Sequence, residues 1–544
     1  MAGEKRPWEA FRRPGTEKLT VPQMPVYDIL RGTAESHPNL LALAFYEHEI
    51  TYRALWVDVC RMANALLTLG LQPDDRVMLM LPNSPAYVVA YYGILRAGGI
   101  VTQVNPLYVE RELQYIATDS QARFLIVADA LYDRVRRLPE STAIEQVIVA
   151  ELSGAQTDAR ALRLRELLEA SPEVDPPSQR TPEDTAVLQY TGGTTGLPKG
   201  AMLTHRNLVA NAWQSGGEAP QPGASRVLAI LPFFHVFGML VLNISVKHAA
   251  RIVLLPRFEI DRVMDAIRDH QITDFPGVPT MYVAVLNYPN AEAYGIGSIR
   301  SLSAGGAAMP VEVMETFVDK FGAEISEGYG LTEASPATHA NPTHDPTLRK
   351  PGSIGIPLPF TDARIVDLET GTRTLPPGEV GELCIQGPQV MQGYWHRPEE
   401  TRAALRDGWL YTGDIARMDE DGYFYIVDRK KDMIIVSGNN VYPREIEEVL
   451  YEHPAVLEAA VIGVPDPYKG EVPKAFISLR PGARLTEEEV LVHLRAQLAP
   501  FKLPKAVEFR GELPKSAVGK LLRRELAAQE RERRNRDEGT HKGA

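Results

Sequence analysis

The chain has 544 residues, which is too long for a single hydrophobic core and predicts at least two domains. Its hydrophobic content of 44% and charged content of 24% are typical of a water-soluble globular protein. The formal net charge of −12 argues against broad nucleic-acid binding. Because its two cysteines, Cys60 and Cys384, lie far apart, a disulfide framework and a cysteine-rich metal site are excluded.

The expected compartment is the cytoplasm. The N-terminus is charged and lacks the apolar centre of a signal peptide. The most apolar stretch, residues 233–250, is interrupted by Lys247 and His248 and predicts a buried helix rather than a membrane span. We expect at most peripheral contact with a membrane.

From residue 40 to about 350, short β-rich runs alternate with helical stretches. Runs typical of strands lie at 75–84, 122–130, 146–152, 226–233 and 250–256. Apolar residues at helical spacing occupy 53–70, 260–270 and 309–322. The alternation predicts an α/β fold of βαβ units with doubly wound, largely parallel sheets. Such sheets bind ligands at the carboxyl ends of their strands.

The stretch YTGGTTGLPKG at 190–200 lies between a predicted strand at 186–190 and a predicted helix at 205–213. A P-loop needs Ser or Thr after its lysine, and here Gly200 follows Lys199, so that assignment fails. Glycines, threonines and a lysine in one loop can still surround a phosphate. A flexible surface turn is the simpler interpretation of this loop alone.

The character of the sequence changes after residue 350. Short strands separated by Gly and Pro predict a β-rich subdomain at about 351–427, within an N-terminal domain of residues 1–430. Smaller α+β units follow in a mobile C-terminal domain at 431–526, with a hinge at 428–432. The charged tail 527–544 is predicted to be disordered.

Several later motifs accompany the glycine-rich loop. They are EGYGLTE at 327–333, GWLYTGD at 408–414, DRKKD at 428–432, SGNNVYPREIE at 437–447 and PKSAVGKLLRR at 514–524. Together they resemble the acyl- and aryl-CoA ligase branch of the adenylate-forming enzymes. The resemblance covers about residues 25 to 526. It implies that a carboxylic acid is activated by ATP to an acyl-adenylate and then transferred to CoA, with Mg²⁺ as cofactor.

The resemblance also assigns roles to individual residues. Lys520 is expected to bridge the attacking carboxylate and the α-phosphate, Glu333 and Thr194 to hold Mg²⁺, and His235 to lie beside the acyl and thiol route. Residues expected to contact the nucleotide or CoA are Thr191, Gly192, Gly193, Thr194, Thr195, Gly196, Lys199, Gly305, Gly306, Ala307, Glu327, Gly328, Tyr329, Gly330, Leu331, Thr332, Asp414, Arg429, Lys431, Gly438 and Asn439.

Within that set, Tyr329 is expected to stack on adenine, Asp414 to accept both ribose hydroxyls and Arg429 to add a further contact. The segment Ser437–Asn440 is expected to border the pantetheine passage after the C-terminal domain rotates. The CoA phosphates could meet Arg444, Lys469 or Lys474.

Each residue alone has a plainer explanation. Glu333 could cap a helix, Tyr329 could be a core aromatic, and Asp414 could be an ordinary turn residue. His235 could be a packed core histidine, and Lys520 could be a solvated lysine in a basic run.

The substrate is expected to be a medium- or long-chain fatty acid. The stretch 407–431 resembles bacterial fatty acyl-CoA synthetases, and the predicted acid pocket is mostly apolar. That pocket comprises Phe234, Val236, Phe237, Gly238, Val278, Thr280, Met281 and Ala304. It contains no carboxylate for an amino group, which argues against amino-acid adenylation.

Other functions remain open at this point. An aryl-CoA ligase of the coumarate or benzoate kind is the first alternative, and a carrier-loading adenylation domain and a luciferase-like oxygenase follow. A nucleotide sensor without turnover is the alternative from a different class. No nucleic-acid partner is expected, and a homodimer is left open.

Overall fold

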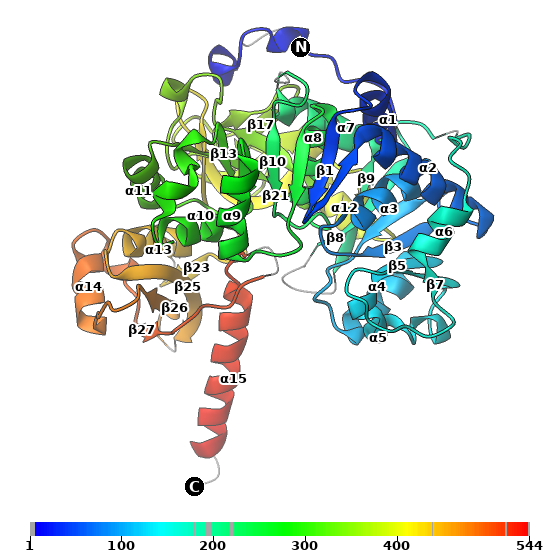
Figure 1. The fold of residues 1–544 in the computed structure, drawn as a ribbon. Helices are drawn as coiled ribbons and strands as arrows, with labels where there is room; N and C mark the ends of the chain where they lie inside the picture. Colours follow the sequence, from blue (N-terminus) through cyan, green and yellow to red (C-terminus); the bar gives the residue numbers. More distant parts are fainter. Residues whose placement is uncertain are drawn as a thin grey trace.

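The computed structural model describes residues 6–178, 180–191, 198–217, 221–437, 439–466, 468–516 and 519–541, the last seven by their backbone alone. Figure 1 shows a large body that contains the first three sheets, with a smaller unit beneath it from which the C-terminal helix projects. The predicted mixed α/β architecture is confirmed.

Two sheets dominate the large body. The nine-stranded sheet runs in the order β16 (Ile356–Pro357), β15 (Ala337–Ala340), β14 (Ile325–Gly330), β13 (Ser301–Ala304), β12 (Asp274–Gly277), β10 (Arg226–Ala229), β11 (Arg251–Leu254), β1 (Leu41–Phe45) and β2 (His48–Thr51). The eight-stranded sheet runs β19 (Gly393–Tyr394), β9 (Lys199–Thr204), β8 (Thr185–Thr191), β4 (Ile100–Gln103), β3 (Arg76–Met80), β5 (Phe124–Ala128), β6 (Gln146–Ala150) and β7 (Leu162–Arg163).

Six adjacent strands from β14 to β1 are parallel, as are the six from β8 to β7. The prediction of doubly wound, largely parallel sheets is therefore correct.

Helices cover these sheets, and the core lies where the two layers meet. They are α1 (Tyr27–Ser36), α2 (Tyr52–Thr68), α3 (Pro85–Arg96), α4 (Glu110–Ser120), α5 (Tyr132–Val135), α6 (Leu164–Ala170), α7 (His205–Gly216), α8 (Val236–Lys247), α9 (Ile260–His270), α10 (Pro279–Leu286), α11 (Val311–Phe321) and α12 (Pro398–Ala404). Side-chain caps fix several starts: Thr51 accepts from the Ala54 amide and Ser84 from the Tyr87 amide. One buried cluster joins α2, α3 and α8 to strands of both sheets, so the two layers pack as one body.

The segment after the glycine-rich loop differs from expectation. The chain forms β9 before α7 begins, and β9 pairs antiparallel with β8 so that Thr191 lies opposite Lys199. The loop therefore joins a hairpin, whereas a P-loop joins a strand to a helix.

Two smaller sheets complete the molecule. The first contains β17 (Asp362–Val366), β18 (Gly381–Gln386), β20 (Leu405–Arg406), β21 (Trp409–Met418) and β22 (Phe424–Arg429). The second contains β23 (Ile434–Val436), β24 (Asn439–Val441), β25 (Val456–Asp466), β26 (Gly470–Leu479) and β27 (Ala506–Phe509), with α13 (Pro443–Tyr451) and α14 (Glu487–Arg495) against it. The chain passes from one sheet to the other between Arg429 and Ile434.

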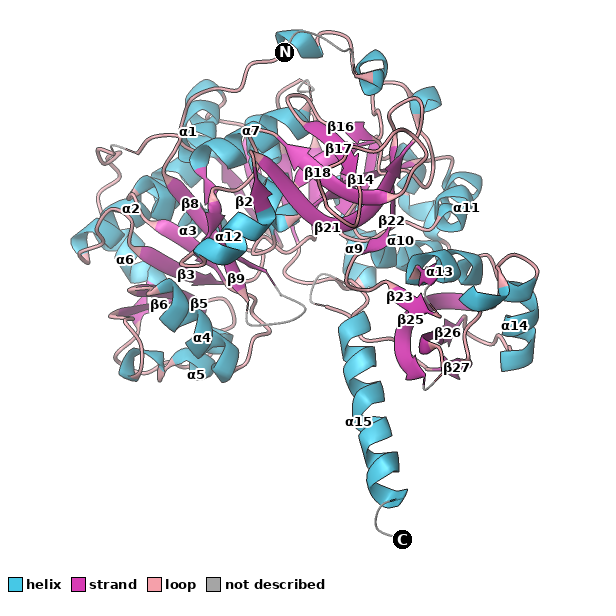
Figure 2. Ribbon diagram, turned by 180° about the vertical axis from the view of Figure 1, so that it is seen from behind, coloured by secondary structure: helices cyan, strands magenta, loops and turns pink. Residues whose placement is uncertain are grey.

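The last helix, α15 (Arg523–His541), corrects the prediction of a disordered tail from residue 527. Figure 2 shows it leaving the C-terminal sheet as a continuous helix. Its first turns are held by the buried Leu526 and by Glu530, whose carboxylate accepts from Lys474 Nζ at 2.8 Å. Within the described parts of the chain, no helix is both long and apolar enough to cross a membrane.

Candidate active site

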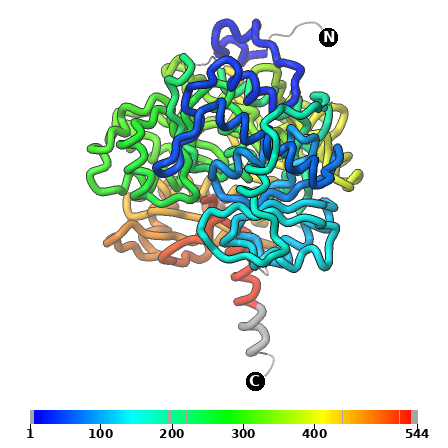
Figure 3. Tube along the Cα trace, turned by 45° about the vertical axis from the view of Figure 1, so that its right-hand side comes forward, coloured from blue at the N-terminus to red at the C-terminus, as the bar shows by residue number. Residues whose placement is uncertain are grey.

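A cavity of about 2670 Å³ lies where the carboxyl ends of the central strands meet the third sheet and the C-terminal unit. Figure 3 shows the C-terminal unit packed against one side of the large body. Most described residues predicted for nucleotide binding line this cavity: Thr191, Lys199, Gly305, Gly306, Ala307, Glu327, Gly328, Tyr329, Gly330, Leu331, Thr332, Asp414, Arg429 and Lys431. Three sheets thus bring together motifs that are far apart in the sequence.

Asp414 and Tyr329 are joined directly in this cavity. The Tyr329 hydroxyl donates to Asp414 Oδ2 at 2.5 Å, and Arg429 Nε lies 3.4 Å from Oδ1 of the same carboxylate. Because Asp414 pairs with Arg429 across β21 and β22, the sheet register sets this contact. Burial and the adjacent Asp414 carboxylate raise the pKa of Tyr329, so the hydroxyl stays protonated and keeps donating.

A second group gathers beside the glycine-rich loop. Lys199 Nζ lies 5.3 Å from the centre of the Tyr394 ring, and the Tyr394 hydroxyl donates to Glu333 Oε1 at 2.8 Å. Tyr394 therefore contacts the Lys199 cation through its ring and the Glu333 carboxylate through its hydroxyl. Tyr394 was not predicted as a site residue, although the sequence GYW at 393–395 could have drawn attention to it.

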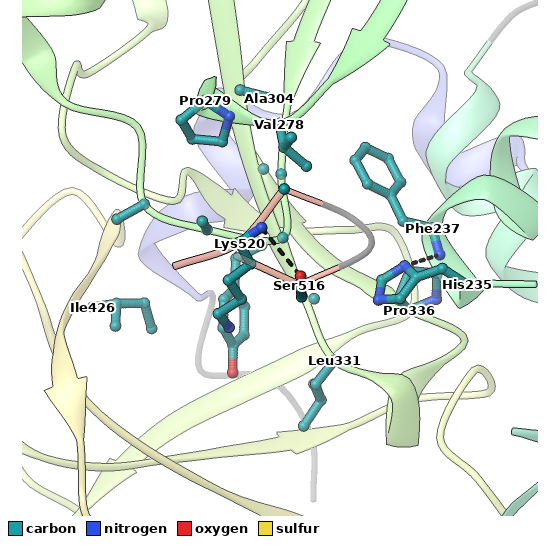
Figure 4. A pocket seen from close by; sticks show the side chains of 18 of the residues that line it. His235, Phe237, Val278, Pro279, Ala304, Leu331, Pro336, Ile426, Ser516 and Lys520 are labelled. Carbon is teal, nitrogen blue, oxygen red and sulfur yellow. Dashed lines mark hydrogen bonds between the residues drawn. The ribbon is translucent and has the colours of Figure 1, made fainter. Parts of the chain in front are cut away.

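Lys520 is half-buried and lines the cavity. Thr280 Oγ1 donates to the Gly519 carbonyl at 3.2 Å, and Lys520 N donates to Ser516 Oγ at 3.1 Å, which seats this turn against α10 (Figure 4). Burial, followed by the nearby Arg429 cation, lowers the pKa of the Lys520 amine to about 7. The Asp414 carboxylate partly opposes that shift.

Arg523 ties the C-terminal unit to the third sheet. Its guanidinium donates to the Glu447 carboxylate and to Asp428 Oδ1 at 3.2 Å. Asp428 also accepts from the Arg444 amide at 2.9 Å. Sequence reasoning treated Arg523 only as part of a basic run, because its partners lie 76 and 95 residues away.

His235 forms the start of α8. Its Nδ1 accepts from the Phe237 amide at 3.2 Å, and its ring lies against the cavity (Figure 4). Burial, and then the Lys520 cation, lowers the pKa of His235 to about 4, so the ring is neutral near pH 7. Because Nδ1 accepts, the ring proton lies on Nε2.

The predicted acid pocket lies next to these groups. Phe234, Val236, Phe237, Val278, Thr280 and Ala304 line the cavity. Gly238 and Met281 do not. Gly238 instead allows close packing, because a Cβ there would lie 2.2 Å from the Pro232 carbonyl oxygen, and Met281 is buried in the core.

Other predicted residues lie elsewhere. Gly192, Gly193, Thr194, Thr195, Gly196 and Gly438 fall outside the described residues. Ser437, Asn439 and Asn440 are exposed and do not line the cavity. Lys474 is buried between Glu508 and Glu530, at 2.7 and 2.8 Å, so the suggestion that it meets CoA phosphates is wrong in this arrangement. Arg444 lines the cavity but is paired with Glu448, and Lys469 does not line it.

Known proteins resemble this chain in both sequence and structure. The family profile described as AMP-binding enzyme matches residues 30–395, and the profile of the AMP-binding enzyme C-terminal domain matches residues 445–520. A long-chain-fatty-acid–CoA ligase of Bacillus subtilis (strain 168) is 44% identical over 564 residues, covering 97% of this chain and 99% of the relative. A long-chain-fatty-acid–CoA ligase of Escherichia coli O6:H1 is 43% identical, covering 84% of this chain and 86% of the relative. A crystal structure of the anthranilate CoA ligase AuaEII in complex with anthranoyl-AMP superimposes with a TM-score of 0.87 at 30% identity, covering 94% of this chain and 98% of that one.

Proposed function

The chain belongs to the AMP-binding enzyme family, and on that premise we propose that it is an AMP-forming fatty-acid–CoA ligase. The observation that carries the proposal is the position of Lys520, which lines one cavity with Asp414 and Glu333, next to an apolar channel. The fatty acid is better supported than an aryl acid, because the chain is 44% identical to a long-chain-fatty-acid–CoA ligase and 38% identical to a feruloyl-CoA synthase of Amycolatopsis.

In the first half-reaction a carboxylate oxygen attacks the α-phosphorus of ATP, and the bond to the β-phosphate oxygen breaks to release pyrophosphate. One anion must approach another, so a positioned cation lowers the barrier. Lys520 is placed to bridge the two anions. Its depressed pKa returns toward the ordinary value when anionic substrates surround it, since opposite charge favours the ammonium form.

The nucleotide is held by groups already in place. Asp414 accepts from the ribose hydroxyls, Tyr329 offers its ring face to adenine, and Lys199 meets the terminal phosphates with Thr191. Glu333 suits Mg²⁺, which binds through one or two carboxylates together with substrate phosphates. When bound there, the ion would supply positive charge beside the leaving pyrophosphate. Among the described residues no group of three or more His, Cys, Asp or Glu side chains could hold an ion alone, which fits a site completed by ATP.

In the second half-reaction the thiol sulfur of CoA attacks the acyl carbon, and the bond to the AMP oxygen breaks. His235 is neutral with its proton on Nε2, so it is suited to donate a hydrogen bond to the acyl carbonyl. The exposed segment at Asn439 must move to border the thiol route, and the backbone at 430–433 is the place for that rotation.

A direct test measures products with ATP, CoA and a panel of acids. We expect AMP, pyrophosphate and acyl-CoA from hexadecanoate, at a kcat/KM at least tenfold above that of benzoate or coumarate, because an apolar channel discriminates by buried methylenes. Formation of ADP would refute adenylation. Faster turnover of the aryl acids would favour the aryl-CoA ligase alternative.

A further inference from the structure

The apolar part of the cavity follows the whole length of α8. The residues of this helix that face it are Val236, Phe237, Leu240, Val241, Ile244, Ser245 and His248, which recur at helical spacing. The channel therefore begins beside His235 and continues to the far end of the helix at His248.

The length of this channel can be estimated from the helix. The 12 residues of α8 separate the two histidines, so the channel extends about 20 Å at roughly 1.5 Å per residue step. An extended chain advances roughly 1.2 Å per bond, as the peptide backbone does. An acyl chain of about 16 carbons therefore reaches from the reaction centre to His248.

The far end is polar, although the middle is apolar. His248 is 8% exposed, and its Nε2 has no hydrogen-bond partner among the residues that the structure describes. Within the same described residues, Ser215 Oγ on the last turn of α7 is also buried without a partner. Both residues line the cavity. Two buried polar atoms without partners are costly, which calls for a group that satisfies them.

The two helix ends lie against each other. Figure 1 shows α7 and α8 as neighbours, and a Cβ built on Gly216 would lie 3.2 Å from His248 Nε2. The absence of a side chain at Gly216 keeps the space in front of the ring open.

One cation, Lys247, lies beside the same space, since a Cβ on Gly216 would lie 3.1 Å from its Nζ. Its Nζ also lies 3.4 Å from the Gly217 carbonyl and 4.9 Å from the centre of the Trp213 ring. Burial, and then the Lys247 cation, lowers the pKa of His248 to about 4, so its ring is neutral near pH 7. A neutral imidazole and a serine hydroxyl are suited to a neutral hydroxyl group, which donates one hydrogen bond and accepts another.

We propose that Ser215 and His248 form a subsite for a terminal hydroxyl, so that the channel accepts long-chain acids oxygenated at the end remote from the carboxylate. The inference rests on the proposed fatty-acid–CoA ligase activity. It names the class of acid that this end of the channel would bind. Binding at the subsite depends on chain length, because the end of a shorter acid cannot reach Ser215 and His248.

The test compares kcat/KM for 16-hydroxyhexadecanoate and hexadecanoate, read as AMP release. We expect a ratio near 1 in the unmodified protein. Ser215→Ala should lower the ratio about tenfold by removing one partner of the hydroxyl. His248→Leu should lower this kcat/KM ratio to a similar extent. If one of the two variants folds poorly, the other still tests the subsite.

Matched controls separate this subsite from general effects on the channel. Ser245→Ala also removes a hydroxyl that lines the cavity, but Ser245 Oγ already donates to the Val241 carbonyl at 2.7 Å, so the ratio should not change. With 12-hydroxydodecanoate and dodecanoate, Ser215→Ala should have no effect, because the shorter chain ends before His248.

The outcomes distinguish the two proposals. No turnover of hexadecanoate by the unmodified protein would refute the proposed function itself. Normal turnover of hexadecanoate with a ratio that is the same in Ser215→Ala, His248→Leu and the unmodified protein would overturn the subsite alone. A preference for hexadecanedioate over both C16 acids would overturn the assignment of a neutral hydroxyl.

Discussion

The nucleotide side of the cavity and the C-terminal unit are built differently. Asp414 is 7% exposed, and it is fixed by sheet pairing and by the Tyr329 hydroxyl within one packed body. Lys520 lines the same cavity but comes from the C-terminal unit, on a turn seated on Thr280 and followed by a helix tied by Arg523. The residues proposed to hold the nucleotide are thus part of a core, whereas the turn that carries Lys520, the proposed catalytic cation, is held by a few polar contacts.

Among the proposed variants, Lys520→Ala should have the largest effect on the rate of adenylation. We expect a loss of adenylation of roughly 10²-fold or more, because a preorganised cation facing developing charge is removed. Thioester formation from preformed acyl-adenylate should change far less. The measurement is pyrophosphate exchange into ATP beside a thioester assay on supplied acyl-adenylate, and equal damage to both would contradict a role confined to one half-reaction.

Arg523→Ala tests the tie between the two units. Loss of its contacts leaves Asp428 and Glu447 without their shared cation, at a cost comparable to breaking a partly buried pair. We expect adenylation to fall about tenfold, with the thioester step unchanged or faster.

The adjacent Arg524, which is exposed, provides the matched control. Arg524→Ala should leave both rates within about twofold, because exposed charges contribute little. A similar fall in this variant would assign the effect to the basic run and not to the tie.

The pH dependence of the two half-reactions should also differ. The Lys520 amine, with a pKa lowered to about 7, is charged below that pH and loses its proton as the pH rises through it. Adenylation kcat/KM for ATP should therefore fall above pH 7, by up to about tenfold per unit. The rate of thioester formation from supplied acyl-adenylate should not show this fall above pH 7. A profile that stays flat from pH 6 to pH 9 would show that the proton on Lys520 is not required.

Tyr394→Phe has the smallest expected effect, since it alters the fixed side of the cavity by one hydroxyl. Removing the donor to Glu333 should raise the KM for ATP about two- to tenfold, which corresponds to the roughly 0.5–1.5 kcal/mol of a typical hydrogen bond. The Mg²⁺ dependence of the rate should shift in the same variant, and a dependence identical to that of the unmodified protein would separate Glu333 from the ion.

The sequence by itself determined the alternating elements, the catalytic motifs and the family resemblance. Local rules suffice there, because periodicity reports burial and spacing reports loop chemistry. The parallel sheets and the buried helix α8 followed from those patterns, and the resemblance, not periodicity, implied that Lys520, Asp414 and Glu333 share one site.

Tertiary structure alone decided the features that depend on distant partners. Tyr394 became a site residue because β19 pairs with β9, and Arg523 became a tie because Asp428 lies on another sheet. Gly238 left the predicted pocket because a carbonyl packs against it, and α15 formed where charge alone predicted disorder. The polar end of the acid channel needed both helix ends in place, since neither Ser215 nor His248 carries a signal in the sequence.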